Sequence, residues 1–130
     1  MKRYLLDTHT LLWYDTDPSR IGKQALRVLQ KSRSQIFVSP ISLFEMRLKQ
    51  RRGRLPEAAP LLSDIQNMLR AYDFHALDLT CDQAILAAAL DWKHHDPFDR
   101  MIAAQALSER LILLSADRQF ASLPGLTTLW

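Results

Sequence analysis

Cysteine is almost missing from this chain of 130 residues, in which Cys81 is the single example. One cysteine cannot form an internal disulfide, so a small secreted scaffold held together by disulfides is excluded and a reducing compartment is favoured. Cys81 falls just inside the start of an expected helix, where we expect a small packed side chain.

Glycine and proline are also scarce, at 3 and 6 residues, which argues against long disordered stretches. No segment approaches the roughly 20 apolar residues of a membrane span, and the run Tyr4–Leu6 is far too short for the core of a signal peptide. We therefore expect a single soluble, cytoplasmic domain over residues 1–130. Its net charge of +3 favours polyanionic partners only mildly.

Short apolar and amphipathic segments alternate along the chain. Strands are predicted at residues 3–6, 36–38, 74–77, 111–114 and 127–130. Helices are predicted at residues 22–32, 40–52, 60–71, 81–92 and 97–109, with a helix or turn at 8–16. Strands that alternate with helices predict an α/β fold around a mainly parallel sheet, and no linker divides it.

Two acidic residues each follow an apolar strand directly. They are Asp7, after residues 3–6, and Asp117, after residues 111–114. Open parallel sheets bind ligands beyond the carboxyl ends of their strands, so both positions favour a functional role. Turn or helix-capping aspartates are the alternative for both.

Glu45 lies within the predicted helix 40–52. Its spacing places it on one face with Ile41, Phe44 and Leu48, and we expect that face to pack on the core. Glu45 then points inward, where a carboxylate is costly unless its charge is compensated. The alternative is a partly exposed Glu45 paired with Lys49, one helical turn later.

Asp96 and Asp99 flank the start of the predicted helix 97–109. Asp96 is a natural N-cap before Pro97, and the helix dipole favours a negative charge at Asp99 in the first turn. Asp99 also shares a face with Ile102 and Ala103, the expected buried side of this helix. We therefore interpret Asp99 as a ligand and Asp96 as a cap with a secondary role.

Four of these acids, Asp7, Glu45, Asp99 and Asp117, are expected to point inward. The sequence has no glycine-rich phosphate loop and no cysteine–histidine zinc spacing, so they suggest an all-oxygen metal site. Oxygen ligands select Mg²⁺ or Mn²⁺ over zinc, and such ions suit phosphodiester hydrolysis because they lower the pKa of a bound water and shield phosphate charge. Without a cation, the cluster would repel itself at neutral pH.

A basic segment follows Glu45 on the same helix, with cations at Arg47, Lys49, Arg51, Arg52 and Arg54. A solvated helix C-terminus explains them well, because its dipole favours cations. Their position near the acids also predicts contacts with a phosphate backbone.

The histidines are weaker signals. His9 is close to Asp7 in sequence, and His94 and His95 precede Asp96, so each could contact substrate or orient an acid, or simply lie on the surface. No Ser-His-Asp pattern is evident.

Four segments carry a resemblance to a known family. Leu5–Trp13 resembles the opening of PIN-domain ribonucleases of the VapC toxin type, and Ser39–Glu45 is similar to the second acidic motif of that family. His95–Ala106 matches the third motif closely, and Ser115–Asp117 is similar to the fourth. The match spans essentially the whole chain in the right order, and the motifs are specific together although each alone is weak.

The resemblance implies a compact three-layer α/β/α fold and an endoribonuclease that depends on Mg²⁺ or Mn²⁺. It also implies a homodimer and inhibition by a small cognate antitoxin encoded beside the toxin, with the helices between residues 22 and 71 as walls of a groove for an amphipathic helix. The acidic quartet carries over to Asp7, Glu45, Asp99 and Asp117, and Asp7 and Asp99 become the principal metal ligands. The auxiliary candidates are Asp96, Thr8 and Ser115, and the candidates for guiding RNA are Arg47, Lys49, Arg51 and Arg52. The segment after Glu45 is more arginine-rich than the lysine-and-glycine pattern usual in the family.

Other functions stay open. A nuclease for DNA or for particular nucleic-acid structures would use the same acids, because nothing in the sequence reads a 2′-hydroxyl. A non-catalytic module would only hold a metal or a partner peptide, and metal binding without turnover would favour it. A phosphoaspartate hydrolase ranks low, because Asp7-Thr8-His9 lacks the second nearby acid that it needs.

Overall fold

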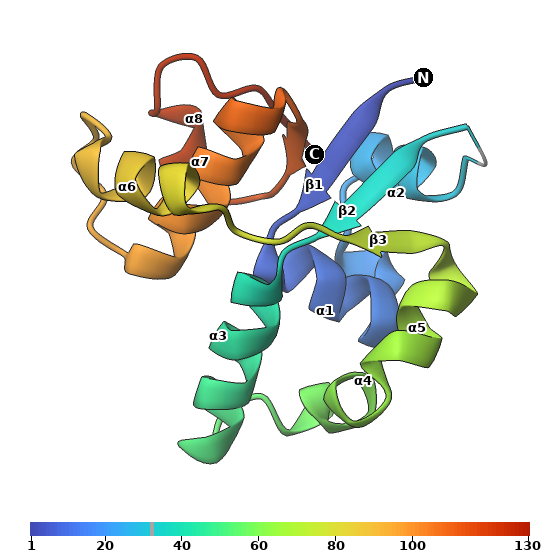
Figure 1. Cartoon of the computed structure of the whole chain (residues 1–130). Coiled ribbons are helices and arrows are strands. Elements are labelled where there is room, and N and C mark those ends of the chain that lie inside the picture. Colours follow the sequence, from blue (N-terminus) through green and yellow to red (C-terminus); the bar gives the residue numbers. More distant parts are fainter. Residues whose placement is uncertain (32) are drawn as a thin grey trace.

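The computed structural model describes residues 1–31 and 33–130, and it is built around one five-stranded sheet (Figure 1). The strands are β1 (Arg3–Leu6), β2 (Gln35–Val38), β3 (Phe74–Ala76), β4 (Ile112–Leu114) and β5 (Thr128–Leu129). Their order is β3-β2-β1-β4-β5, and every neighbouring pair is parallel. The predicted α/β fold is confirmed, and the sheet is parallel throughout.

Alternation along the short strands creates a core on each face of the sheet. In β1, Tyr4 and Leu6 belong to one apolar cluster and Leu5 to the other. Helices α1 (Thr8–Thr16), α2 (Lys23–Leu29), α3 (Pro40–Arg51), α4 (Ala59–Ser63) and α5 (Ile65–Tyr72) contribute buried residues to the first cluster. Helices α7 (Pro97–Glu109) and α8 (Arg118–Ala121) contribute to the second, and α6 (Cys81–Ala89) packs on α7. The result is the expected α/β/α arrangement (Figure 1).

Helices α1, α3, α6, α7 and α8 each begin at a capping side chain. Ser39 caps α3 with Pro40 at the first position, and Thr80 and Gln83 form the predicted capping box of α6. Among the acids, Asp7, Asp96 and Asp117 cap α1, α7 and α8 respectively. Capping satisfies backbone N–H groups that have no partner within the helix.

Some local predictions are wrong. The single helix predicted at 60–71 is divided into α4 and α5, because Asp64 (φ −141°, ψ 41°) leaves the helical conformation and accepts a hydrogen bond from Asn67. A 3₁₀ turn, η2 (Pro56–Ala58), precedes α4, and another, η1 (Pro18–Arg20), follows α1. Cys81 is exposed rather than packed, because the first position of α6 faces outward.

The ends of several other elements also differ. Helix α2 ends at Leu29, and the predicted end of that helix at Ser32 lies outside the described residues. The predicted helix 81–92 stops at Ala89, which leaves residues 90–96 as a loop, and the short helix α8 has no counterpart in the prediction. Within the described ranges, no helix combines the length and apolar character needed to cross a membrane.

The strand order has a reversal beside β1. The chain proceeds outward from β1 to β2 and β3 and then returns to place β4 on the other side of β1. The backbone N–H of Asp7 donates to the carbonyl of Leu114 at 3.1 Å, so the carboxyl ends of β1 and β4 are held together. Crevices at such reversals are the usual ligand sites of parallel sheets.

Candidate active site

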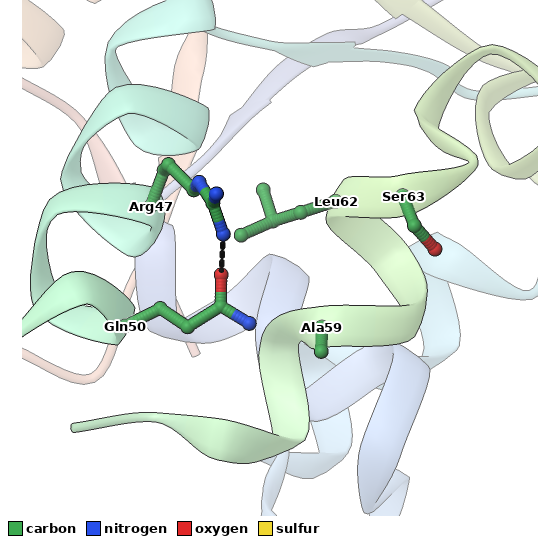
Figure 2. A pocket seen from close by; sticks show the side chains of 5 residues that line it. All are labelled: Arg47, Gln50, Ala59, Leu62 and Ser63. Carbon is green, nitrogen blue, oxygen red and sulfur yellow. Dashed lines mark hydrogen bonds between the residues drawn. The ribbon is translucent and has the colours of Figure 1, made fainter. Parts of the chain in front are cut away.

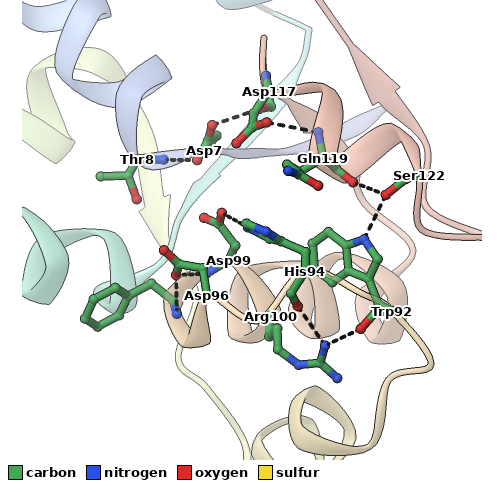
Figure 3. A network of polar contacts seen from close by, with 12 residues as sticks. Asp7, Thr8, Trp92, His94, Asp96, Asp99, Arg100, Asp117, Gln119 and Ser122 are labelled. Carbon is green, nitrogen blue, oxygen red and sulfur yellow. Dashed lines mark hydrogen bonds and ion pairs between the residues drawn. The ribbon is translucent and has the colours of Figure 1, made fainter.

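Asp7 occupies the carboxyl end of β1 and is buried, with 6% exposure. Its Oδ1 accepts a hydrogen bond from the Thr8 amide at 2.7 Å, and its Oδ2 accepts one from Ser115 Oγ at 2.8 Å. One donor begins α1 and the other follows β4, so the carboxylate is fixed from two elements. Two of the three auxiliary candidates, Thr8 and Ser115, thus contact Asp7 (Figure 3 shows the Thr8 contact).

Glu45 also points inward, as predicted, with 5% exposure. Its Oε1 accepts a hydrogen bond from Thr8 Oγ1 at 2.8 Å, and its Oε2 lies 2.7 Å from Lys49 Nζ. The sequence left two interpretations of Glu45 open, an inward side chain or an ion pair with Lys49. The structure shows that Glu45 points inward and also pairs with Lys49. Ser42 Oγ lies 3.0 Å from Thr8 Oγ1 and extends this buried network.

The apolar face predicted for α3 is wrong in one respect. Phe44 does not share the inward face of Glu45 but is 60% exposed. The residues of α3 that are buried are Ser42, Glu45 and Met46. Helix α3 therefore turns a largely polar stripe toward the sheet edge, because the acids and hydroxyls there satisfy one another.

Asp99 projects from the first turn of α7, and its side chain is 14% exposed. Its Oδ2 lies 2.7 Å from His94 Nε2, so His94 orients this acid (Figure 3). Asp96 accepts hydrogen bonds from the amides of Phe98 and Asp99 at 2.9 and 3.1 Å. Its predicted role as the cap that positions Asp99 is confirmed.

The loop that carries His94 is held by Arg100. The guanidinium group donates to five backbone carbonyls, those of Ala87, Ala88, Leu90, Trp92 and His94, at 2.6–3.4 Å. These carbonyls belong to the last turn of α6 and to residues 90–94, so one side chain closes the helix end and fixes the loop. The orientation of Asp99 therefore depends on Arg100, which holds the loop that carries His94.

The expectation that Asp117 points inward is wrong, because its side chain caps α8 at an exposed helix start. Asp117 is exposed, and its Oδ1 accepts a hydrogen bond from the Gln119 amide at 2.9 Å as the cap of α8. Its backbone N–H donates to Ser115 Oγ at 3.0 Å, so Ser115 links Asp117 to Asp7. Asp117 thus lies at the same sheet edge but at the solvent side of it (Figure 3).

Burial raises the pKa of two of these acids, and neighbouring carboxylates raise it further. Burial raises the pKa of Asp7 above its usual range, opposed by Ser115, His9 and Thr8 and increased by Glu45. Burial likewise raises the pKa of Asp99 to about 7, opposed by the hydrogen bond from His94 and increased by the charges of Asp7, Asp96 and Glu45. Asp7, Glu45 and Asp99 therefore lie close enough for their charges to interact, and these three residues are called the acid group.

The acid group fits a hard cation chemically. Its carboxylate oxygens are the ligands that Mg²⁺ and Mn²⁺ prefer. Within residues 1–31 and 33–130, no three Asp, Glu, His or Cys side chains are gathered closely enough to hold one ion together. Mg²⁺ commonly uses one or two carboxylates and keeps several waters, so it does not require a cluster of three protein ligands. Binding by all four predicted ligands stays a prediction.

The basic residues of α3 are divided between two sides of the helix. Lys49 faces the acid group, whereas Arg47 donates to Gln50 at 2.6 Å and borders a cavity of about 410 Å³ between α3 and α4. Figure 2 shows Arg47 and Gln50 across this cavity from Leu62 and Ser63. Arg51 and Arg52 are exposed.

Among known proteins, the family model described as "PIN domain" matches residues 4–126. The chain belongs to the PIN-domain family. This PIN domain is 30% identical over 133 residues to Ribonuclease VapC22 of Mycobacterium tuberculosis, and the match covers 100% of both chains. The family expected from the four acidic motifs is confirmed.

Solved structures have the same fold as this PIN domain. VapBC2 from Rickettsia felis, bound to a promoter DNA fragment, has a TM-score of 0.71 at 19% identity, with 98% of each chain covered. DNA-bound VapBC from Salmonella typhimurium also has a TM-score of 0.71, at 22% identity, with 99% of this chain and 98% of that chain covered.

Some residues that shape the site of this PIN domain escaped sequence reasoning. Ser42 carried a usable signal, because it precedes Glu45 by about one helical turn and so shares its face. Arg100 carried none, because its carbonyl partners become visible only once the loop is folded. Of the histidines, His94 orients Asp99, whereas His9 stacks against Trp13 and His95 is exposed.

Proposed function

We propose that this PIN domain, over residues 1–130, is a Mg²⁺- or Mn²⁺-dependent endoribonuclease that acts as the toxin of a toxin–antitoxin pair. The observation that carries the proposal is the acid group at the sheet edge, where burial and mutual repulsion raise the pKa of Asp7 and Asp99. Such a group suits a site that binds a divalent cation before it acts. Full-length similarity to a protein named a ribonuclease supports RNA as the substrate.

Asp7 and Asp99 are the proposed principal metal ligands, and Glu45 and Asp117 complete the site directly or through water. When bound, Mg²⁺ or Mn²⁺ would activate water and stabilise charge on the phosphate. Ser115 and the Thr8 amide keep the Asp7 carboxylate in one orientation, and His94 does the same for Asp99. Hydrolysis then adds the oxygen of water to phosphorus and breaks one phosphorus–oxygen ester bond.

Cleavage assays test the proposal directly. Purified protein is incubated with RNA in Mg²⁺, Mn²⁺ or EDTA, beside Asp7→Asn, Asp99→Asn and the exposed control Asp91→Asn. We expect cleavage only with metal, a loss of about 100-fold or more in both site variants, and an unchanged control. Equal cleavage by all four proteins would exclude the assignment. A parallel DNA substrate separates a ribonuclease from a DNA nuclease.

The proposed partners are a small cognate antitoxin, a second copy of the chain and RNA, all in the cytoplasm. Structural neighbours described as members of toxin–antitoxin systems, from Klebsiella pneumoniae and Mycobacterium tuberculosis, support the antitoxin. We propose the cavity between α3 and α4 as part of its docking groove, and Arg47, Lys49, Arg51 and Arg52 as RNA contacts. Since Lys49 is paired with Glu45, Arg51 and Arg52 are the cations most available to phosphate. A small neighbouring reading frame whose product abolishes cleavage would identify the antitoxin.

A further inference from the structure

Two aromatic residues each come one position before a member of the acid group. Phe44 precedes Glu45 on α3, and Phe98 precedes Asp99 on α7. Their ring centroids are 5.8 Å apart and their planes are tilted by 49°. Phe98 is half-buried and Phe44 is 60% exposed. The two rings, called the Phe pair below, therefore offer aromatic surface to solvent at the edge of the site.

The exposure of Phe44 is unusual within this molecule. Among the described residues, the only other large apolar side chains that are exposed are Met1 and Ile85. Core packing does not require a phenyl ring at this position, because the buried face of α3 is formed by Ser42, Glu45 and Met46. A single exposed apolar side chain is ordinary, but Phe44 is paired with a second ring, so the two together form an aromatic surface.

Cationic charge accompanies the Phe pair. Arg51 is exposed and lies about two helical turns after Phe44, so helical periodicity places both on one face of α3. That face is distinct from the one that carries Glu45. Aromatic rings beside a cationic track are the combination that binds single-stranded nucleic acid, with bases on the rings and phosphates on the cations.

We propose that the Phe pair is a stacking subsite for one unpaired nucleobase next to the phosphate that is cleaved. The proposal rests on the ribonuclease function and deepens it, because it names the side chains that would hold a base beside the cleaved phosphate. Bases in a duplex are stacked on their neighbours and offer no free face, whereas an unpaired base can leave the strand and cover a ring. The acid group then receives the adjoining phosphate, and Arg51 contacts the backbone further along.

Substrates with one abasic position test the subsite. A short single-stranded RNA is made as a series in which each nucleotide in turn lacks its base, and kcat and KM are measured for wild type and for Phe44→Leu and Phe98→Leu. We expect each variant to lower kcat/KM about 10-fold, mainly through KM, because base–aromatic stacking has about this strength. For one abasic position in the series, the kcat/KM of wild type should fall to that of Phe44→Leu. The kcat/KM of Phe44→Leu should not decrease further on the same substrate.

Three controls make the test specific. Phe44→Trp should retain wild-type kcat/KM, because it keeps a stacking face, and Ile85→Leu should change nothing, because Ile85 is exposed on another helix. Duplex RNA of the same sequence should be cleaved more slowly than the single strand. Circular dichroism verifies that the variants are folded, and light scattering measures their mass.

The outcomes separate this proposal from the ribonuclease function itself. If wild type cleaves RNA but Phe44→Leu matches it on every substrate, the subsite is wrong and the nuclease stands. If the variants instead change the mass of the protein, the Phe pair contacts a second copy and the proposal is overturned. If wild type cleaves nothing, binding of the abasic series in EDTA, followed by fluorescence anisotropy, still decides whether a base stacks on the Phe pair.

Discussion

Replacing Asp99 by asparagine should stabilise the metal-free protein at alkaline pH while abolishing its activity. Burial, together with the charges of Asp7, Asp96 and Glu45, raises the pKa of Asp99 from an ordinary 3.8 to about 7. A difference of about 3 units corresponds to about 4 kcal/mol, which is the free energy that the charged carboxylate removes from the folded state. Asparagine has a similar shape, stays neutral at every pH and can still hydrogen-bond His94.

The sign of the pH dependence follows from the direction of the shift. The unfolded chain releases the Asp99 proton near pH 4, whereas the folded chain holds it until about pH 7. The contribution of Asp99 to wild-type stability is therefore complete below about pH 4 and is lost as the pH rises through about 7. The free energy of unfolding of Asp99→Asn, relative to wild type, should thus increase between about pH 4.5 and 8 and reach at most about 4 kcal/mol.

Urea denaturation in EDTA at several pH values measures this difference. Asp117→Asn is the matched control, because Asp117 is an exposed helix cap whose charge does not affect Asp99, and it should stay within about 0.5 kcal/mol of wild type. Adding Mg²⁺ at pH 8 should stabilise wild type more than Asp99→Asn, because a ligand stabilises the state that binds it. Curves for Asp99→Asn and wild type that run parallel from pH 4.5 to 8 would refute the electrostatic reasoning.

Two further substitutions test supports of the site, and a third tests the packing of the core. Ser115→Ala removes the 2.8 Å hydrogen bond to Asp7, so kcat/KM for RNA should fall about 10-fold. The pH–rate profile should move to higher pH, because this hydrogen bond lowers the pKa of Asp7. An unchanged profile would contradict this role of Ser115. Arg100→Lys replaces the planar guanidinium by an ammonium group whose three donors cannot reach all five carbonyls. Urea denaturation should show that the free energy of unfolding falls by about 3 kcal/mol. A decrease below about 1 kcal/mol would exclude a stabilising role for the contacts between Arg100 and these carbonyls. Gly22→Ala places a Cβ 2.6 Å from backbone and ring atoms of Trp130, so we expect a loss of about 1–3 kcal/mol and altered tryptophan fluorescence; wild-type stability would mean that Trp130 moves freely.

Local sequence signals predicted the parts of the site that depend on one element at a time. Asp7 could be placed because a buried strand ends there, and Asp96 because a proline follows it at a helix start. In both cases, the position along the chain also fixes the position in space. The parallel sheet then brings strand ends together, so the proximity of Asp7 and the segment around Ser115 followed from topology.

Predictions that needed side-chain partners from other elements were less successful. Helical spacing correctly predicts that Glu45 points inward but assigns Phe44 to the same face, because an apolar side chain is expected on the face that packs on the core. At this sheet edge, Thr8 and Lys49 satisfy Glu45, which allows the polar stripe to be the buried one. The contact between His94 and Asp99 depends on the loop conformation that Arg100 holds, and no local pattern encodes it.

The closure of residues 90–94 by Arg100 limits how this region can be altered. Surface loops ordinarily accept inserted or deleted residues at little thermodynamic cost. Here the carbonyls of Leu90, Trp92 and His94 must meet one guanidinium group, so changing the number of residues would misalign them and release the imidazole from Asp99. A peptide tag or a one-residue deletion placed between Ala89 and Asp96 would therefore act as an active-site mutation, although the chain there is at the surface.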